Sequence, residues 1–163
     1  MRQGRRARRV WAVLFALVAA GTARAGDSGG LRRGLRGHLR GESFVAVPGV
    51  AALPAGVRDA LQALWHSPRF EVAEPGAEFQ VTDVILKPNL PIRRLVLAGC
   101  SADHCLIYYE RGGIAHTHLV VLLRTKDAVR FDWGGVAPPD LADLVQLKDA
   151  VISGKVRGDT GPW

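Results

Sequence analysis

The chain has 163 residues, of which 48% are apolar, and it carries 22 Lys and Arg against 15 Asp and Glu. Six of the basic residues fall within residues 1–25, which contain no acid, so the rest of the chain has 16 bases against 15 acids. The formal net charge of +7 is therefore no evidence for nucleic-acid binding, because most of it belongs to this first segment.

Residues 1–25 have the three parts of a secretory signal. An arginine-rich start is followed by an apolar run over residues 10–20 and by the small-x-small sequence Ala23-Arg24-Ala25. The run is shorter than the roughly 18–20 residues that a membrane helix needs. We expect cleavage after Ala25 and a periplasmic or secreted protein without a membrane span in its mature form. A retained anchor is the alternative.

The remaining residues suit a single domain. Residues 26–53 begin with a stretch rich in Gly and Arg, in which five glycines oppose a helix, and we expect a mobile, solvated leader there. Contacts of its arginines with phosphate groups are the alternative. Residues 54–154 are expected to form the domain, and residues 155–163 a polar tail.

The elements within the domain follow from periodicity and from breakers. A helix is predicted over residues 54–66, and a last helix begins with Asp140 as its N-cap and ends at Gly154. Between them, strands are predicted at residues 69–72, 78–86, 94–98, 105–109, 114–124 and 128–133. Sequential strands joined by short turns, such as Arg111-Gly112-Gly113, predict an antiparallel meander. The predicted fold class is α+β, with an N-terminal and a C-terminal helix packed on the sheet.

The two cysteines, Cys100 and Cys105, bracket four residues between adjacent predicted strands: Ser101, Ala102, Asp103 and His104. In an exported protein this pair should be a disulfide that closes a small ring at the end of a hairpin. If the pair is reduced, the same residues suggest a metal or redox site. A rigid, polar loop is expected to present these four residues to a partner, and a plain structural staple is the alternative.

The sequence gives weaker signals for metal binding and for catalysis. His116 and His118 lie two apart on a predicted strand and share a face, so with His104 they are a candidate metal site. The competing interpretation takes His116 and His118 as ordinary sheet residues. The sequence has no nucleophile elbow, phosphate loop or dinucleotide fingerprint, so we expect neither an enzyme nor a cofactor.

The exported α+β pattern and the stretch Cys100-Ser101-Ala102-Asp103-His104-Cys105 resemble the Ivy family, which comprises periplasmic inhibitors of vertebrate (c-type) lysozyme. That family carries a Cys-Lys-Pro-His-Asp-Cys loop, which inserts into the lysozyme cleft so that its His and Asp engage the catalytic carboxylates. In this chain Ser101 and Ala102 replace Lys and Pro, and Asp103 and His104 occur in the reverse order. The resemblance implies a lysozyme-type partner, contacts by the loop residues and, because family members are often dimeric, a homodimer.

Overall fold

The computed structural model describes residues 30–85, 87–159, 161 and 163, and the predicted secretory signal lies outside them. The strands are β1 (Val45–Ala46), β2 (Arg93–Cys100), β3 (His104–Arg111), β4 (Thr117–Arg124), β5 (Arg130–Val136) and β6 (Arg157–Gly158). The helices are α1 (Arg33–Gly41), α2 (Ala55–Leu64) and α3 (Leu144–Ser153), and a short 3-10 helix, η1, covers Val50–Ala52. All neighbouring strands are antiparallel and follow chain order, which confirms the α+β meander.

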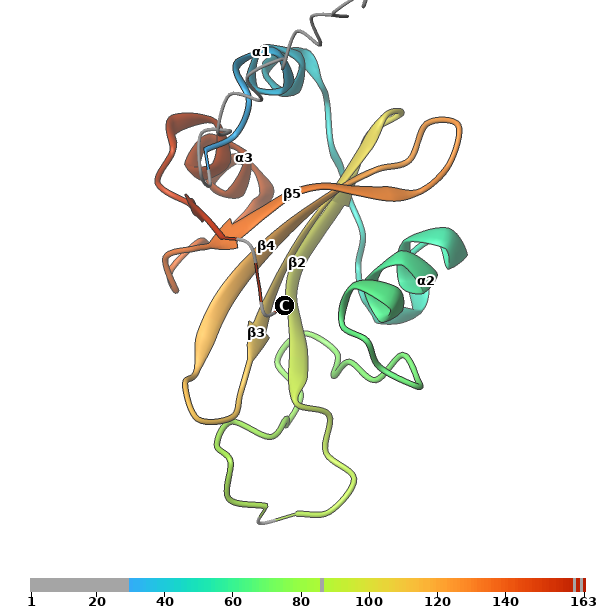
Figure 1. The fold of residues 1–163 in the computed structure, drawn as a ribbon, viewed down its shortest axis with the longest axis vertical. Helices are drawn as coiled ribbons and strands as arrows, with labels where there is room; N and C mark the ends of the chain where they lie inside the picture. Colours follow the sequence, from blue (N-terminus) through green and yellow to red (C-terminus); the bar gives the residue numbers. More distant parts are fainter. Residues whose placement is uncertain (1–29, 86, 160, 162) are drawn as a thin grey trace, which may run out of the picture.

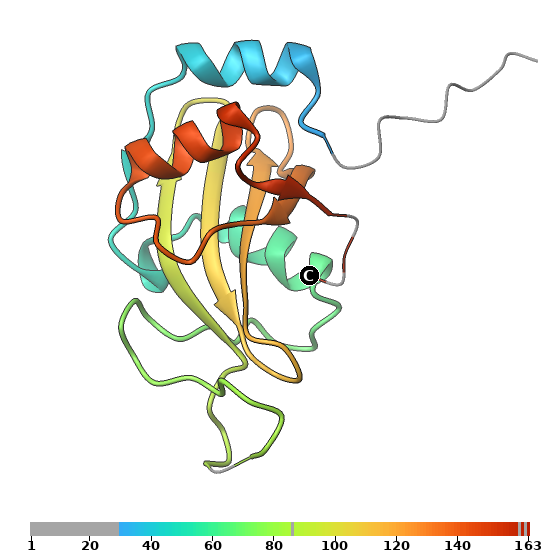
Figure 2. The same ribbon diagram turned by 90° about the vertical axis from the view of Figure 1, so that its left-hand side faces the viewer.

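The sheet lies between two helical layers. Helices α1 and α3 cover one face, which we call the α1/α3 face, and α2 covers the other (Figure 1; Figure 2 shows α3 in front of the sheet and α1 across its upper end). Side chains alternate along β3, so Leu106 and Tyr108 pack under α1 and α3, while Ile107 and Tyr109 pack under α2. Strand β3 is therefore buried from His104 to Glu110.

The predicted leader is not a solvated linker in its described part, residues 30–53. It forms α1, in which Leu39 is fully buried, and Leu31 just before α1 is buried in the same apolar cluster as Leu147 of α3. Each helical glycine costs about 1 kcal/mol relative to alanine, whereas each buried leucine contributes about 1.5–3 kcal/mol. Packing against α3 therefore outweighs the poor intrinsic propensity of this segment.

The predicted polar tail is also part of the fold. Strand β6 pairs with β5, Val156 is buried, and the ring of Trp163 lies 5.4 Å from that of Phe131. The Arg93 guanidinium donates to the carbonyl oxygen of Trp163 at 2.9 Å. These contacts were not predicted because they join residues that are distant in the chain.

Two of the predicted strands are absent from the described residues. The runs 69–72 and 78–86, the latter without the undescribed Leu86, form no strand, and this region instead makes two isolated bridges, Ala73↔Arg94 and Thr82↔Gly113. Prolines and a glycine at 75, 76, 88 and 91 interrupt any continuous ladder there. The strand predicted at 114–124 begins only at Thr117.

The two predicted helices are present, with one change in capping. Helix α2 begins after Pro54, as expected. Helix α3 is capped by Asp143, whose side chain accepts a 2.8 Å hydrogen bond from the backbone N–H of Gln146, and not by Asp140. Gly154 ends α3 in the left-handed conformation, as the sequence predicts. Within the described residues no helix is long and apolar enough to cross a membrane.

Candidate functional site

Cys100 and Cys105 form the predicted disulfide, and they are directly opposed across β2 and β3. The backbone N–H of Ser101 donates to the carbonyl of His104 at 2.7 Å inside the ring. The N–H of Thr125 donates to the carbonyl of Asp103 at 2.8 Å, which ties the ring to the adjacent connection between β4 and β5. The loop is therefore held by one covalent and two backbone contacts.

The expectation that His104 lies at an exposed tip is wrong. Its residue is 3% exposed, because strand pairing already begins at His104, which faces Arg124, and its side chain points to the covered α1/α3 face. Of the four loop residues only Ala102 is exposed, and Ser101 and Asp103 are partly buried. His104 is thus not available to a partner in this structure.

His104 is held between two carboxylates. Its Nδ1 lies 2.6 Å from Glu42 Oε1, and its Nε2 lies 3.3 Å from Asp132 Oδ2. Each ring nitrogen of His104 therefore has a carboxylate oxygen as its hydrogen-bonding neighbour. The Arg124 guanidinium donates to the same Asp132 oxygen at 3.0 Å. We call these four residues the His104 network.

The end of α1, the bulge between β4 and β5, and the disulfide loop bring the His104 network together. Glu42 follows the last turn of α1, and Lys148 of α3 donates to its carbonyl oxygen at 2.5 Å. The β4–β5 register shifts between Leu122 and Leu123, and this bulge turns Asp132 toward His104. The Ser101 hydroxyl donates to Glu42 Oε2 and accepts from the backbone N–H of His104 at 3.0 Å. The disulfide loop and α1 are therefore joined through one buried ionic network.

A pocket of about 640 Å³ opens beside this network, between α1 and the disulfide loop. Its lining combines residues of α1 and the residue before it with residues of the disulfide loop, the end of β4 and the β4–β5 connection: Arg32, Gly34, Leu35, His38, Asp103, His104, Arg124 and Lys126. The imidazole of His38 bridges Glu42 and Asp103 at 3.0 and 3.1 Å. Arginine and lysine outnumber acids on this lining, and we call it the cationic pocket.

A second polar cluster lies at the other end of the α1/α3 face. His116 Nε2 and His118 Nε2 each lie 3.2 Å from Glu110 Oε1. Arg94 binds the other carboxylate oxygen of Glu110, Oε2, at 2.5 Å. We call Glu110, His116 and His118 the Glu110 cluster. Its ligand atoms all lie within 4.8 Å of one another, as do those of His38, Glu42 and His104.

Burial shifts the titration of groups around the Glu110 cluster. Desolvation lowers the pKa of His118, against the opposing effect of the nearby Glu110 charge. Burial also raises the pKa of Tyr108 to about 12, and the Glu110 charge adds to that shift. Tyr108 donates its hydroxyl hydrogen to the carbonyl of Pro138 at 2.7 Å.

The predicted metal set of His104, His116 and His118 is not assembled. His104 begins β3, whereas His118 pairs with Glu110 at its far end, six residues away or about 20 Å along the strand. His116 and His118 do come together, as the spacing of two predicts. Glu42, Glu110 and Asp132 were not among the predicted site residues. Alternation along β3 places Glu110 on the face of His104, but no local signal identifies Glu42 or Asp132.

Comparisons of the chain with protein-family models, with curated proteins and with solved structures found no match.

Proposed function

We propose that this protein is an exported binding protein, without catalytic activity of its own, that recognises an acidic group through the cationic pocket and the disulfide loop. The observation that carries this proposal is the clustering of Arg32, Arg124 and Lys126 on one pocket that is bordered by a covalently closed loop. Carboxylates and phosphates are the groups that such cations bind by charge-assisted hydrogen bonds.

The accessible cations of the pocket differ in how strongly residues of the protein itself hold them. Arg124 is held by Asp132 at 3.0 Å, and its side chain is 33% exposed. Lys126 is 66% exposed and lies 4.0 Å from Asp103, which is too far for a strong contact. Arg32 is exposed just before α1. Lys126 and Arg32 are therefore the side chains best placed to meet an acidic partner.

The rigidity of this end of the molecule favours recognition. The ring is closed by the disulfide and fixed to the neighbouring connection by the Thr125 hydrogen bond, and beneath it the His104 network joins it to α1. A surface ordered before binding loses little conformational entropy when a partner docks. The buried His104 then supports the loop from below, and the contacts with an acidic partner fall to Lys126 and Arg32, beside the exposed Ala102.

The candidate partner is a c-type lysozyme, as the resemblance to the Ivy family implies. Two catalytic carboxylates in a lysozyme cleft would meet the cations of the pocket, in place of the His104 contact that the sequence suggested. Export to the periplasm would place the protein where such an enzyme attacks the cell wall.

A binding and inhibition assay tests this proposal. The exported protein is titrated against a vertebrate c-type lysozyme, and affinity and the clearing of a peptidoglycan suspension are measured together. Lys126→Glu should weaken binding at least about tenfold by reversing one charge-assisted contact. Lys155→Glu makes the same charge change at an exposed residue outside the pocket lining and should have no effect. Absence of binding by the unaltered protein would refute lysozyme as the partner.

A further inference from the structure

We propose that Glu110, His116 and His118 bind one Zn²⁺ ion. This site lies at the opposite end of the α1/α3 face from the disulfide loop, and it does not depend on the function proposed above. It differs from the set expected from the sequence, because a carboxylate from the adjacent strand replaces His104.

The spacing of the three ligand atoms fits a zinc ion. With metal–ligand distances of about 2.0–2.1 Å, neighbouring ligands of a tetrahedral site lie about 3.3–3.4 Å apart. The Glu110 oxygen lies 3.2 Å from each imidazole nitrogen. Two edges of a tetrahedral face thus have nearly the required length, and the ligand atoms of the two histidines lie within 4.8 Å of each other. Two imidazoles and one carboxylate are also a ligand set that zinc uses when water completes its coordination.

The other group of potential ligands, His38, Glu42 and His104, does not fit as well. His104 Nδ1 and Glu42 Oε1 are 2.6 Å apart, which is a hydrogen-bond distance and too short for two ligands of one tetrahedral ion. The second nitrogen of His104 is already directed to Asp132. This group is therefore part of the His104 network, and it serves as an internal comparison for the Glu110 cluster.

Arg94 completes the environment of the carboxylate. Its guanidinium holds Glu110 Oε2, so Oε1 is directed at the two imidazoles, as outer-shell partners orient carboxylate ligands in metal sites. The Glu110 side chain is only 9% exposed, and buried carboxylates are normally paired or bound to metals. The same positive charge of Arg94 lowers the affinity for a dication, so the site should hold zinc less tightly than a closed structural site does.

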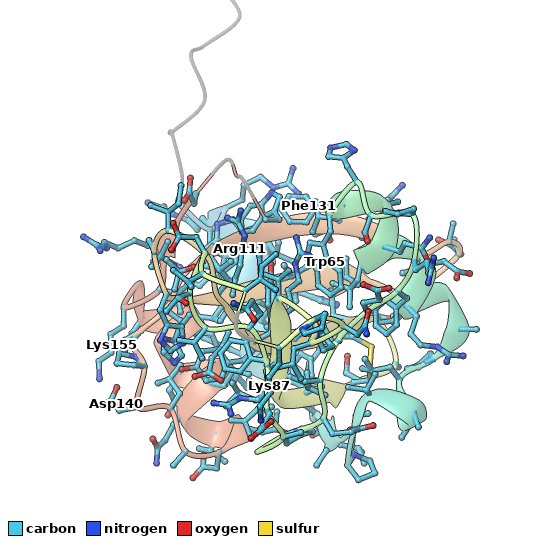
Figure 3. All side chains as sticks on the ribbon, turned by 90° about the horizontal axis from the view of Figure 1, so that it is seen from below. Trp65, Lys87, Arg111, Phe131, Asp140 and Lys155 are labelled. Atoms are coloured by element: carbon cyan, nitrogen blue, oxygen red, sulfur yellow. A yellow bond between two sulfur atoms is a disulfide. The ribbon has the colours of Figure 1, made fainter. Side chains whose placement is uncertain are left out.

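The site reaches the surface at His116. His116 is 38% exposed, and with Arg94 and Phe79 it lines a pocket of about 440 Å³. Figure 3 looks onto this end of the molecule and labels Arg111, the residue after Glu110, and Lys87, which also lines the pocket. A metal ion can therefore enter from solvent, and a water molecule can take the fourth position.

Metal titration of the untagged, chelator-treated protein tests the inference. Isothermal titration with Zn²⁺ should show one ion bound per chain, and Co²⁺ in its place should give the visible absorption of a tetrahedral site. His116→Ala removes a half-exposed ligand and should weaken Zn²⁺ binding at least about tenfold. His118→Gln should do the same, and circular dichroism of both variants verifies that they are folded.

Matched controls come from the other histidines of the chain. His66→Ala, at an exposed residue, and His38→Ala, in the competing group, should leave Zn²⁺ affinity unchanged. The inference is overturned if the unaltered protein binds no Zn²⁺. It is also overturned if the folded His116→Ala and His118→Gln variants bind as tightly as the unaltered protein, or if His38→Ala alone abolishes binding.

Discussion

His104 and Glu110 stand at opposite ends of β3, point to the same face of the sheet and are both buried, at 3% and 7% exposure. The apolar side chains of Leu106 and Tyr108 separate them. Each has polar partners: His104 contacts two carboxylates, and Glu110 forms an ion pair with Arg94. One strand thus supplies the centre of two polar clusters, and each cluster borders its own pocket.

Replacing His104 should destabilise the fold. His104→Ala removes one hydrogen-bond partner each from the buried carboxylates of Glu42 and Asp132. Leaving buried polar groups short of a partner typically costs about 1–3 kcal/mol per group. His38→Ala is the control, because the His38 side chain is 51% exposed and its pairs should contribute less than about 1 kcal/mol. Urea unfolding of the three proteins measures both effects. Equal stability of His104→Ala and the unaltered protein would show that the network is not structural.

The disulfide should contribute modestly to stability. Closing so small a ring restricts the unfolded chain by about 2 kcal/mol, and the β2–β3 pairing extends from the cysteines to Arg93 and Arg111, far beyond the ring. The double variant Cys100→Ser, Cys105→Ser should therefore fold, with a lower midpoint of urea unfolding.

The two cysteines should be oxidised to each other in the protein from the periplasmic fraction. Thiol titration of the denatured protein, without reductant, should detect no free sulfhydryl. Two free thiols would contradict the assignment of an oxidised loop.

The only two tyrosines of the chain, Tyr108 and Tyr109, should titrate late. Burial raises the pKa of each to about 12 from the ordinary value near 10. As the pH rises, the tyrosines of the unfolded chain lose their phenol protons before those of the folded protein do. The two buried, protonated tyrosines therefore add to the free energy of unfolding below pH 10, and this contribution is lost as the pH rises from 10 to about 12. Tyrosinate absorbance should therefore rise together with unfolding. A component titrating near pH 10 in the folded protein would contradict the burial of one ring.

Export should shorten the chain. Cleavage after Ala25 removes the segment with six arginines and leaves a nearly neutral protein, which begins at Gly26. The intact mass of the protein from the periplasmic fraction measures this directly. Recovery of the uncleaved chain from the membrane fraction would mean that residues 10–20 act as an anchor.

Local sequence signals account for much of the fold. Pro54 and the apolar spacing after it locate α2, and the Cys100–Cys105 pair locates the β2–β3 hairpin with its disulfide. Helix α1 could not be predicted in this way, because its glycines disfavour a helix and its stability comes from contacts with α3, more than 100 residues later in the chain.

The candidate sites depend more strongly on long-range contacts. Glu42 and His104 are 62 residues apart, and they meet because α1 crosses the end of the sheet beside the disulfide loop. Asp132 reaches His104 through a bulge that no sequence pattern specifies. By contrast, the spacing of two predicted that His116 and His118 lie together, and their rings are 5.0 Å apart although His116 precedes β4.

Hydrogen exchange with and without a saturating c-type lysozyme tests the central claim most directly, because it locates the bound surface on the unaltered protein. Binding at the end of the sheet that carries the disulfide loop, which we call the disulfide end, should slow the exchange of backbone amide hydrogens there. The affected peptides should be those that cover the loop before His104 and the connection after Arg124. Peptides covering residues 111–118, at the far end of the sheet, should not change. Protection confined to residues 111–118, or no protection anywhere, would contradict the proposal that the disulfide end is the recognition surface for lysozyme.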